Sequence, residues 1–373
     1  MTVFTSPFNT ILILSAIFLV IYNEYYEFLT VKHSQWTASE ATLPPLTRSD
    51  GRDTVRILFV GDPQIQGYQD EPALLGYITR WDADRYLKTY YHHALSFVNP
   101  DVVIIMGDLL DEGSISSDWE FERYATRLKN IYRVPEGVQI IYLAGDNDIG
   151  GEGNDPITSQ KISRFEKHFS SVTEAVQYKH VAFHKINVLP YIHRPPSERQ
   201  DSSFRTQLQE MGKTTQSASI HIVLSHTGIS EAMLHRHIQI MRVLKPKYAF
   251  SAHSHYSSYM KHNLLQLVDF YKKVYPRDST LDRITEDIFM EEYRIPTCSY
   301  RMGVPNMAYA AAVIDADGTL HYTLLWLPSR YRQLYRYAAF AIFIAVVIFY
   351  RFMCRPRARR RHDYYSYNSH IGS

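Results

Sequence analysis

Short apolar runs that each end in glycine and aspartate recur along the first half of the chain. Residues 55–64 read VRILFVGDPQ, in which β-favouring residues lead into a Gly-Asp turn. Residues 101–108 (DVVIIMGD) and 138–146 (VQIIYLAGD) repeat this order. Continuous apolar runs of this length are typical of buried strands, and the residues after such strands lie at one edge of a sheet. The pattern predicts three strands with Asp62, Asp108 and Asp146 on neighbouring loops.

Segments with helical spacing separate these strands. Apolar residues recur at near-helical intervals in residues 81–98, and residues 119–132 and 159–169 have the same character. Further apolar runs at 182–189, before His226, and before His253 and His255 predict more strands. Residues 313–327, with an Asp-Ala-Asp-Gly turn, predict a closing hairpin. We expect the polar segment 194–219 to be a long irregular loop.

The two ends of the chain are apolar in a different way. Residues 1–23 carry no charged side chain, and residues 3–22 are long enough to cross a hydrocarbon core of about 30 Å. A cleaved signal peptide is disfavoured because there is no basic n-region and NEYYEF stands at the cleavage position. We therefore expect a signal-anchor transmembrane helix at 1–31 and a polar linker at 32–54.

A second span is predicted at 334–353. Its apolar centre at 337–350 is flanked by Arg336 and Arg351, whose side chains can reach the interface, so a buried core helix is the weaker alternative. Three arginines precede this apolar centre and six follow it, which favours a cytosolic tail at 354–373. The N-terminus is then cytosolic too, and the body at 55–329 faces the lumen or the exterior.

Charge and cysteine content limit the partners and the chemistry. Residues 351–373 have a balance of +5, and the chain totals +2, so the rest carries −3 and is no polyanion-binding surface. We read the basic tail as an orientation signal or a lipid contact, and expect no nucleic-acid partner. Cys298 and Cys354 fall on opposite sides of the second span, so the body is expected to lack a disulfide and to depend on its core and on metal.

Oxygen and imidazole side chains gather at the predicted strand ends. Each has an ordinary explanation when taken singly, because Gly-Asp turns and lone histidines are common. Three crowded carboxylates, however, would repel one another without cations, and the histidines add further ligands. Together these residues predict a site for two divalent ions with a shared carboxylate. The candidate ligands are Asp62, Gln64, Asp108, Asp146, His226, His253 and His255.

These residues resemble the five motifs of the calcineurin-like metallophosphoesterase superfamily. The motifs stand here at 62–64 (DPQ), 107–111 (GDLLD), 145–148 (GDND), His226, and 252–255 (AHSH). Their order and spacing fit, and the resemblance covers residues 55–327. It implies an α/β (α+β) fold, a two-layer β-sandwich flanked by helices, with the metals at strand ends.

The resemblance also implies which residues bind each metal. It gives Asp62, Gln64, Asp108 and His255 to one ion, and Asp108, Asp146, His226 and His253 to the other. Asp108 would bridge the two ions and, with Asn147, act in catalysis. Gln64 stands where the family usually has histidine, and Asp146-Asn147 stands where it has Asn-His, which makes the site richer in oxygen and favours Mn²⁺.

Asn147 is the departure that matters most. The family's histidine there helps to protonate or stabilise the leaving oxygen, whereas asparagine donates a hydrogen bond but cannot transfer a proton. His184, His193 and His235 are the alternative donors to consider.

A closer resemblance is to the membrane-anchored metallophosphoesterase 1 branch of the superfamily, through GDPQIQG, ISRFEKHF and IPTCSYR. That branch removes an ethanolamine-phosphate side branch from a mannose of glycosylphosphatidylinositol anchors in the secretory pathway. The resemblance implies a multi-pass protein of the endoplasmic reticulum or Golgi that acts on the anchor glycolipid or on anchored proteins and aids their exit from the endoplasmic reticulum. Two alternatives stay open: a lumenal phosphatase or phosphodiesterase with another substrate, and a catalytically weak protein that binds anchors or cargo.

Overall fold

The computed structural model describes residues 7–37, 43, 53–69, 73–192, 198–274 and 285–353. It divides into two compact units, one formed by Met1–Asn23 with Arg330–Ser373 and the other by Glu24–Ser329. The predicted basic tail at 354–373, most of the expected linker, and His193 lie outside the described residues.

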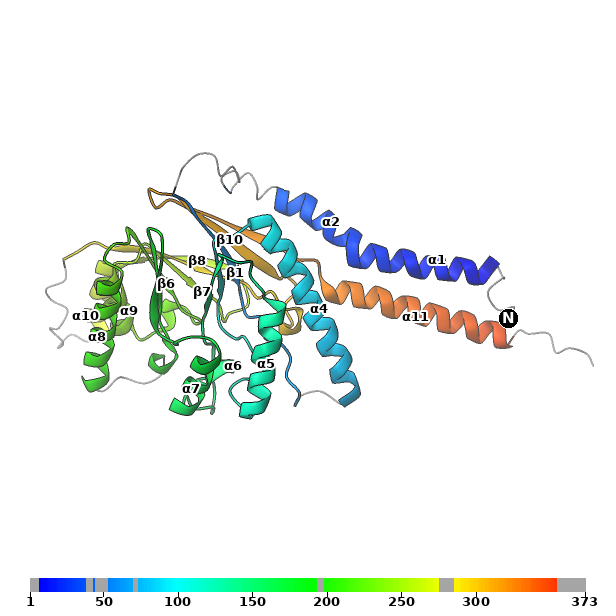
Figure 1. The fold of residues 1–373 in the computed structure, drawn as a ribbon, viewed down its shortest axis with the longest axis horizontal. Helices are drawn as coiled ribbons and strands as arrows, with labels where there is room; N and C mark the ends of the chain where they lie inside the picture. The colour runs from blue at the N-terminus through cyan, green and yellow to red at the C-terminus, as the bar shows by residue number, and fades with distance from the viewer. Residues whose placement is uncertain are drawn as a thin grey trace, which may run out of the picture. The chain divides into compact units, whose positions relative to one another are not determined.

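Two sheets form the centre of the unit Glu24–Ser329 (Figure 1). The first has the order β11-β10-β1-β2-β3, and the second has the order β4-β5-β6-β7-β9-β8. The strands of the first sheet are β1 (Val55–Val60), β2 (Val102–Ile105), β3 (Gln139–Tyr142), β10 (Ala308–Ile314) and β11 (Leu320–Trp326). Those of the second are β4 (Glu174–Tyr178), β5 (Val181–Lys185), β6 (Ile220–Leu224), β7 (Tyr248–Ser251), β8 (Ser258–Asn263) and β9 (Phe289–Arg294).

Helices connect and cover the sheets. The helices described in this unit are α2 (Glu27–Val31), α4 (Ala73–Val98), α5 (Asp118–Ile131), α6 (Asp146–Ile149), α7 (Ser159–His168), α8 (Glu198–Thr214), α9 (Leu234–Leu244) and α10 (Leu264–Val274). Figure 1 shows α4 and α5 on the side of the first sheet and α8, α9 and α10 on the side of the second. The architecture is the mixed two-sheet fold with flanking helices that the sequence predicts.

The core lies between the two sheets. Phe59 of β1 packs on Phe250 of β7 with ring centroids 4.3 Å apart. On β10 the inward-facing Ala310 and Ala312 are small, so large side chains of the opposite sheet fill the space above them. The apolar runs recognised in the sequence are buried because both faces of these strands are covered.

The prediction of an irregular loop at 194–219 is wrong, because residues Glu198–Thr214 form helix α8. Only Phe204, Leu208 and Met211 are apolar and buried along its length, and they lie on one face at intervals of four and three residues. That narrow stripe packs in the cluster that also contains α9 and α10. The remaining residues are polar enough that the segment resembles a loop when it is read by composition.

Parallel pairing brings the predicted site residues to one edge. β1, β2 and β3 are parallel in the first sheet, and β6 and β7 are parallel in the second, so within each sheet their carboxyl ends point the same way. Backbone hydrogen bonds join neighbouring loops of each sheet: Gln64 N–H donates to Asp108 O at 2.9 Å, and Ala252 N–H donates to His226 O at 2.8 Å. Between the sheets, the His253 backbone N–H donates to Asp62 Oδ1 at 3.2 Å, so the loops after the strands of both sheets meet.

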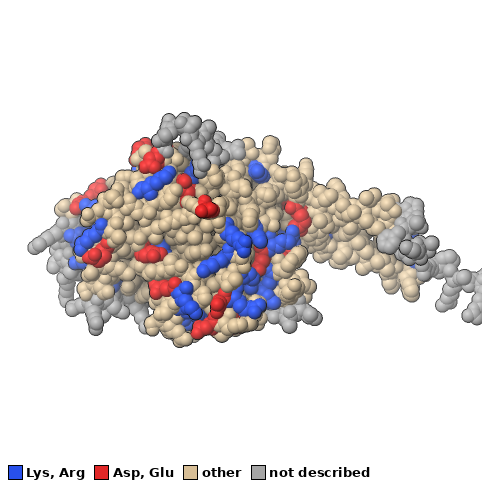
Figure 2. Space-filling view, in the orientation of Figure 1, with Lys and Arg blue, Asp and Glu red and all other residues tan. Residues whose placement is uncertain are grey.

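The terminal unit contains α1 (Pro7–Ile21) and α11 (Arg330–Met353). Asn23 and Gln333 exchange hydrogen bonds, since Gln333 Nε2 donates to Asn23 O at 2.8 Å and Asn23 Nδ2 donates to Gln333 O at 3.3 Å. The two helices Phe8–Trp36 and Arg330–Met353 are long and apolar enough to cross a membrane. On the face drawn in Figure 2 their surface is almost entirely without charge. These features indicate membrane association.

The start of the expected linker is structured. Lys32–Trp36 is a π-helical turn, and Trp36 is fully buried, with its indole Nε1 donating to Trp326 O at 2.8 Å. Trp36 thus packs against the end of β11.

Candidate metal centre

Asp62 follows β1 and is completely buried. Its Oδ1 accepts a hydrogen bond from the His253 backbone N–H at 3.2 Å, while Oδ2 has no partner among the residues that the structure describes. Burial raises the pKa of this carboxyl to about 7, and repulsion from Asp108 adds to the effect. A buried oxygen without a partner is costly, and a cation would satisfy it.

Asp108 follows β2 and lies at the centre of the group. Its Oδ2 accepts hydrogen bonds from Gln64 Nε2 at 2.8 Å and from Asn147 Nδ2 at 3.2 Å. Its Oδ1 accepts the Asn147 backbone N–H at 3.1 Å and lies 3.3 Å from His226 Nε2. This carboxylate is therefore in contact with residues from three other loops.

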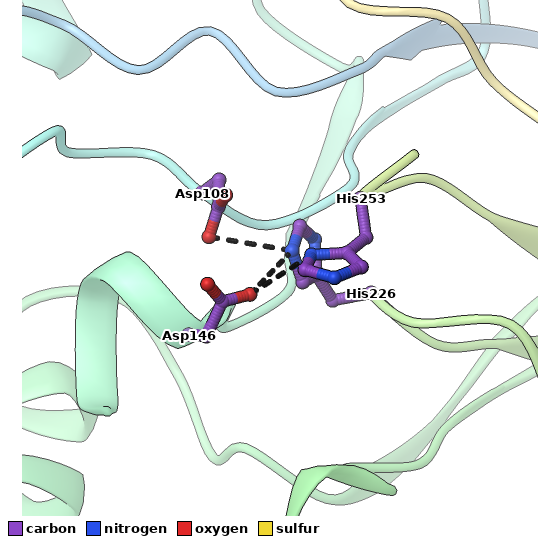
Figure 3. Close-up of side chains that lie close together, drawn as sticks. All are labelled: Asp108, Asp146, His226 and His253. Atoms are coloured by element: carbon purple, nitrogen blue, oxygen red, sulfur yellow. Dashed lines mark hydrogen bonds and ion pairs between the residues drawn. The ribbon is translucent and has the colours of Figure 1, made fainter. Parts of the chain in front are cut away.

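Asp146 lies on the same side as Asp108, and His226 and His253 face these two carboxylates (Figure 3). Asp146 Oδ1 lies 3.2 Å from His226 Nε2 and 3.1 Å from His253 Nδ1. Burial alone would raise the pKa of Asp146, but the hydrogen bonds from both histidines outweigh it and lower that pKa. Burial would lower the pKa of His226, but the charge of Asp108 outweighs it and raises that pKa. A metal ion would replace the proton that these groups share.

The tautomer of His226 is set by the backbone. Its Nδ1 lies 2.8 Å from Met106 O and donates to that carbonyl, which leaves Nε2 directed at Asp108 and Asp146. This is the arrangement that a metal-ligating imidazole requires.

The predicted ligands form two overlapping sets. Ligand atoms of Asp108, Asp146, His226 and His253 lie within 4.8 Å of one another, and so do those of Asp62, Asp108 and His255. Gln64 Nε2 is 3.4 Å from His255 Nε2, so the amide belongs beside the second set, with its oxygen available after rotation about the last side-chain bond. The structure thus brings all seven predicted ligands together, and the donor set fits divalent cations. Their assignment as ligands stays a prediction.

Five of the seven ligands have left-handed backbone conformations. Their φ angles are 39° at Asp62, 36° at Gln64, 48° at Asp108, 63° at His253 and 64° at His255. Such angles are uncommon outside glycine and cost about 1 kcal/mol or more each. The strain is concentrated at the positions that point side chains toward the centre of the site.

Two glycines allow the loops to approach closely. Gly107 has a φ of 96°, and a Cβ there would lie 2.5 Å from His226 Nδ1. A Cβ at Gly145 would lie 2.1 Å from Asp108 Oδ1. The glycine before Asp108 is therefore required by space and by its positive φ, and the glycine before Asp146 is required by space.

Asp148 supports the site from behind. Its fully buried carboxylate accepts backbone N–H groups of Leu109 and Leu110, each at 3.1 Å, and of Gly145 at 2.9 Å. Burial, helped by repulsion from Asp108, raises the pKa of this carboxyl to about 8. Asp148 joins the loops that carry Asp108 and Asp146.

Glu292 has a similar position on the second sheet and was not singled out by the sequence. Its Oε1 accepts from Ser251 Oγ at 2.8 Å and from Ile229 N–H at 2.9 Å, and His262 Nε2 donates to Oε2 at 2.9 Å. Glu292 therefore links the loop after His226 to the strand before His253. In the sequence FMEEYR nothing distinguishes this buried glutamate from its half-exposed neighbour Glu291.

The alternative proton donors belong to other parts of the fold. His184 Nε2 is 3.0 Å from His221 Nδ1 in the β5–β6 pair, and His235 lies against Tyr271 and Gln239 in the α9–α10 region. Asn147 remains the residue at the family's usual donor position.

The family model for calcineurin-like phosphoesterases matches residues 55–257, more than half of the chain. Metallophosphoesterase 1 of Danio rerio is 33% identical over 132 residues, which cover 35% of this chain and 33% of that protein. Cell division control protein 1 of Saccharomyces cerevisiae is 26% identical over 160 residues, covering 41% and 31%. The metallophosphoesterase 1 homolog of Caenorhabditis elegans is 24% identical over 383 residues, covering 95% and 94%.

The match thus spans about a third of the length of the Danio rerio protein and nearly all of the Caenorhabditis elegans one. These similarities support placement in the branch of metallophosphoesterase 1 and cell division control protein 1. The family model covers more than half of the chain, and residues of the five motifs lie together at the strand ends of both sheets, so the chain belongs to the calcineurin-like phosphoesterase family.

Proposed function

We propose that this protein is a dinuclear-metal phosphodiesterase that removes ethanolamine-phosphate from a mannose of glycosylphosphatidylinositol anchors. The observation that carries the dinuclear part is the position of Asp108, whose carboxylate belongs to both ligand sets. A shared carboxylate is the arrangement that holds two cations about 4 Å apart in two-metal hydrolases.

The residues of the site have different proposed roles in binding the metal ions and in catalysis. Divalent cations bound here would supply Lewis acidity to a phosphoryl group and lower the pKa of an attacking water. Asp108 belongs to both ligand sets, and His226 donates from Nδ1 to Met106 O, so Nε2 is the nitrogen that a metal ion would bind in place of a proton. Asn147 offers an amide N–H as a hydrogen-bond donor but has no proton to transfer. The set of three aspartates and an amide favours Mn²⁺ on hardness grounds.

The substrate class is supported by two independent features. Relatives named metallophosphoesterase 1 match the chain, and the chain has two helices that are long and apolar enough to span a membrane. A membrane-bound hydrolase meets lipid-linked phosphodiesters directly. We propose location in the endoplasmic reticulum or Golgi, with the catalytic unit in the lumen, the anchor glycolipid or anchored proteins as partners, and faster export of anchored proteins as the result.

The test compares substrates on the purified full chain with added Mn²⁺. We expect release of ethanolamine-phosphate from a mannosyl ethanolamine phosphodiester, hydrolysis of an aryl phosphodiester, and slower hydrolysis of an aryl phosphomonoester. Activity on the monoester alone would overturn the phosphodiesterase assignment and favour another lumenal phosphatase. Full metal occupancy with no hydrolysis of any ester would favour the binding protein that Asn147 makes conceivable.

A further inference from the structure

The outward face of α4 changes character along the helix. At its start Leu75, Tyr77, Ile78 and Trp81 are 57%, 71%, 59% and 56% exposed. We call these four residues the α4 apolar patch. Further along, the exposed residues of the same helix are polar: Lys88, Thr89, His92, His93 and Ser96. Four large apolar side chains within two turns form a contiguous surface of a kind that soluble surfaces seldom leave uncovered.

The patch adjoins the two residues where the chain leaves this unit. Arg85, one turn after Trp81, has its Cζ 5.4 Å from the centre of the Trp81 ring and forms an ion pair with Glu24. Tyr86 OH donates to Pro328 O at 2.9 Å. Glu24 and Ser329 are the ends of the unit, and the chain continues from them directly into α1 and α11. The middle of α4, one turn after the patch, is thus fixed beside the two points where the chain passes into the candidate spans.

Exposed aromatic side chains also lie where the chain leaves this unit. Tyr25 and Tyr26, next to Glu24, are 62% and 57% exposed. Tyrosine and tryptophan beside the end of a span are the residues that favour the headgroup region, because their rings are apolar and their N–H or O–H groups reach water.

The other side of the patch adjoins the loop of the metal centre. Arg80, between Ile78 and Trp81, donates from Nη1 to Gly67 O at 3.2 Å and stacks on the Tyr68 ring at 4.7 Å. Gly67 lies three residues after Gln64, and Tyr68 N–H is held by Glu112 at 2.9 Å. The first turns of α4 therefore connect the residues that lead into the spans with a ligand-bearing loop.

We propose that the α4 apolar patch is seated in the headgroup region of the membrane that the two candidate spans enter, and that it holds the metal centre next to lipid-linked phosphodiesters. The occupant is a lipid surface because the patch combines tryptophan, tyrosine and branched aliphatic residues with arginine and continues into the ends of the apolar helices. The first half of the proposal stands without the proposed function, and the second half rests on it.

Depth quenching tests the first half on the full chain reconstituted in phosphatidylcholine vesicles. A fluorescent label is placed at Tyr77→Cys in a Cys354→Ser background, where Cys298 is buried and not labelled. Lipids with a nitroxide near the headgroup should quench this label several-fold more than a label at Phe270→Cys on α10, which is 58% exposed. Equal quenching at the two positions would overturn the proposal. The patch would then face water or a second copy of the chain.

A pair of substrates tests the second half. Ile78→Asp with Trp81→Asp should lower hydrolysis of a vesicle-embedded phosphodiester about tenfold or more and leave hydrolysis of a soluble aryl phosphodiester unchanged. Arg123→Asp with Trp119→Asp on α5 is the matched control and should change neither rate. Unchanged hydrolysis of the embedded substrate by the Ile78/Trp81 variant would overturn the positioning role. If wild type hydrolyses neither substrate, the proposed function fails, and the quenching experiment still decides the docking surface.

Discussion

The side-chain amide of Asn147 donates to Asp108 Oδ2 at 3.2 Å, and its backbone N–H donates to Asp108 Oδ1 at 3.1 Å. Asn147 is therefore fixed against the carboxylate that both ligand sets share. A histidine at this position would stand in the same place with a proton to transfer.

Asn147→His is expected to raise turnover, because general acid help of typically 10²–10⁴-fold is missing from the wild-type site. The gain should be at least about tenfold for an alkyl phosphodiester, whose leaving alkoxide needs a proton, and small for an aryl phosphodiester. Steady-state rates on the two esters measure it. Equal rates for both proteins on both esters would show that the proton comes from elsewhere.

Asp108→Asn should remove the bridging charge, and His253→Ala should remove one ligand. Both variants are expected to hold fewer metal ions than wild type and to lose hydrolysis, because the remaining ligands no longer neutralise two cations. Elemental analysis of the purified full chain gives the occupancy, and His92→Ala on the exposed face of α4 is the control. Full occupancy in either variant would refute the ligand assignment.

Glu292 is expected to act on the metal centre through the loops it joins. Glu292→Ala should weaken metal affinity about 10- to 100-fold, as loss of outer hydrogen-bond partners commonly does. Glu292→Gln, which keeps the acceptor for Ser251 and Ile229, should recover most of that affinity. Metal titration separates this effect from a general loss of stability, and Glu291→Gln on the same strand should bind metal as wild type does.

Buried histidine makes the fold sensitive to acid. Burial, together with the neighbouring His221, lowers the pKa of His184 to about 4. Between the usual value near 6.5 and this value, the unfolded chain binds a proton that the folded chain does not, so stability falls as pH falls, by about 3 kcal/mol in all. His184→Gln should flatten the loss of thermal stability between pH 6.5 and 4. An unchanged slope would show that His184 is protonated in the fold.

The orientation of the chain is testable with two tags. One at Ser373 should be accessible to antibody in cells whose plasma membrane alone is permeabilised, because six arginines follow the apolar centre of the second span at 337–350. One at Gly137, an exposed turn before β3, should be accessible only after internal membranes are opened. The reverse pattern would place the metal centre in the cytosol and remove the anchor substrate.

Local patterns predicted β1, β2 and β3 and the clustering of Asp62, Asp108 and Asp146, because a buried parallel strand and its terminal loop are encoded by adjacent residues. The contribution of Glu292 was not predictable, since its partners Ile229, Ser251 and His262 come from separate elements and only folding brings them together. Helix α8 was not predicted because only three apolar residues are buried along it.

The left-handed backbone at five ligand positions has a consequence for the evolution of this fold. Glycine at any of the five would relax the chain and remove a ligand by one substitution, so drift would favour it once the chemistry was no longer selected. A descendant that only binds its old substrate should therefore show glycine or unstrained angles at these positions. Backbone torsion angles thus offer a way to tell working hydrolases from inactive descendants before any assay, and this chain retains a side chain at all five.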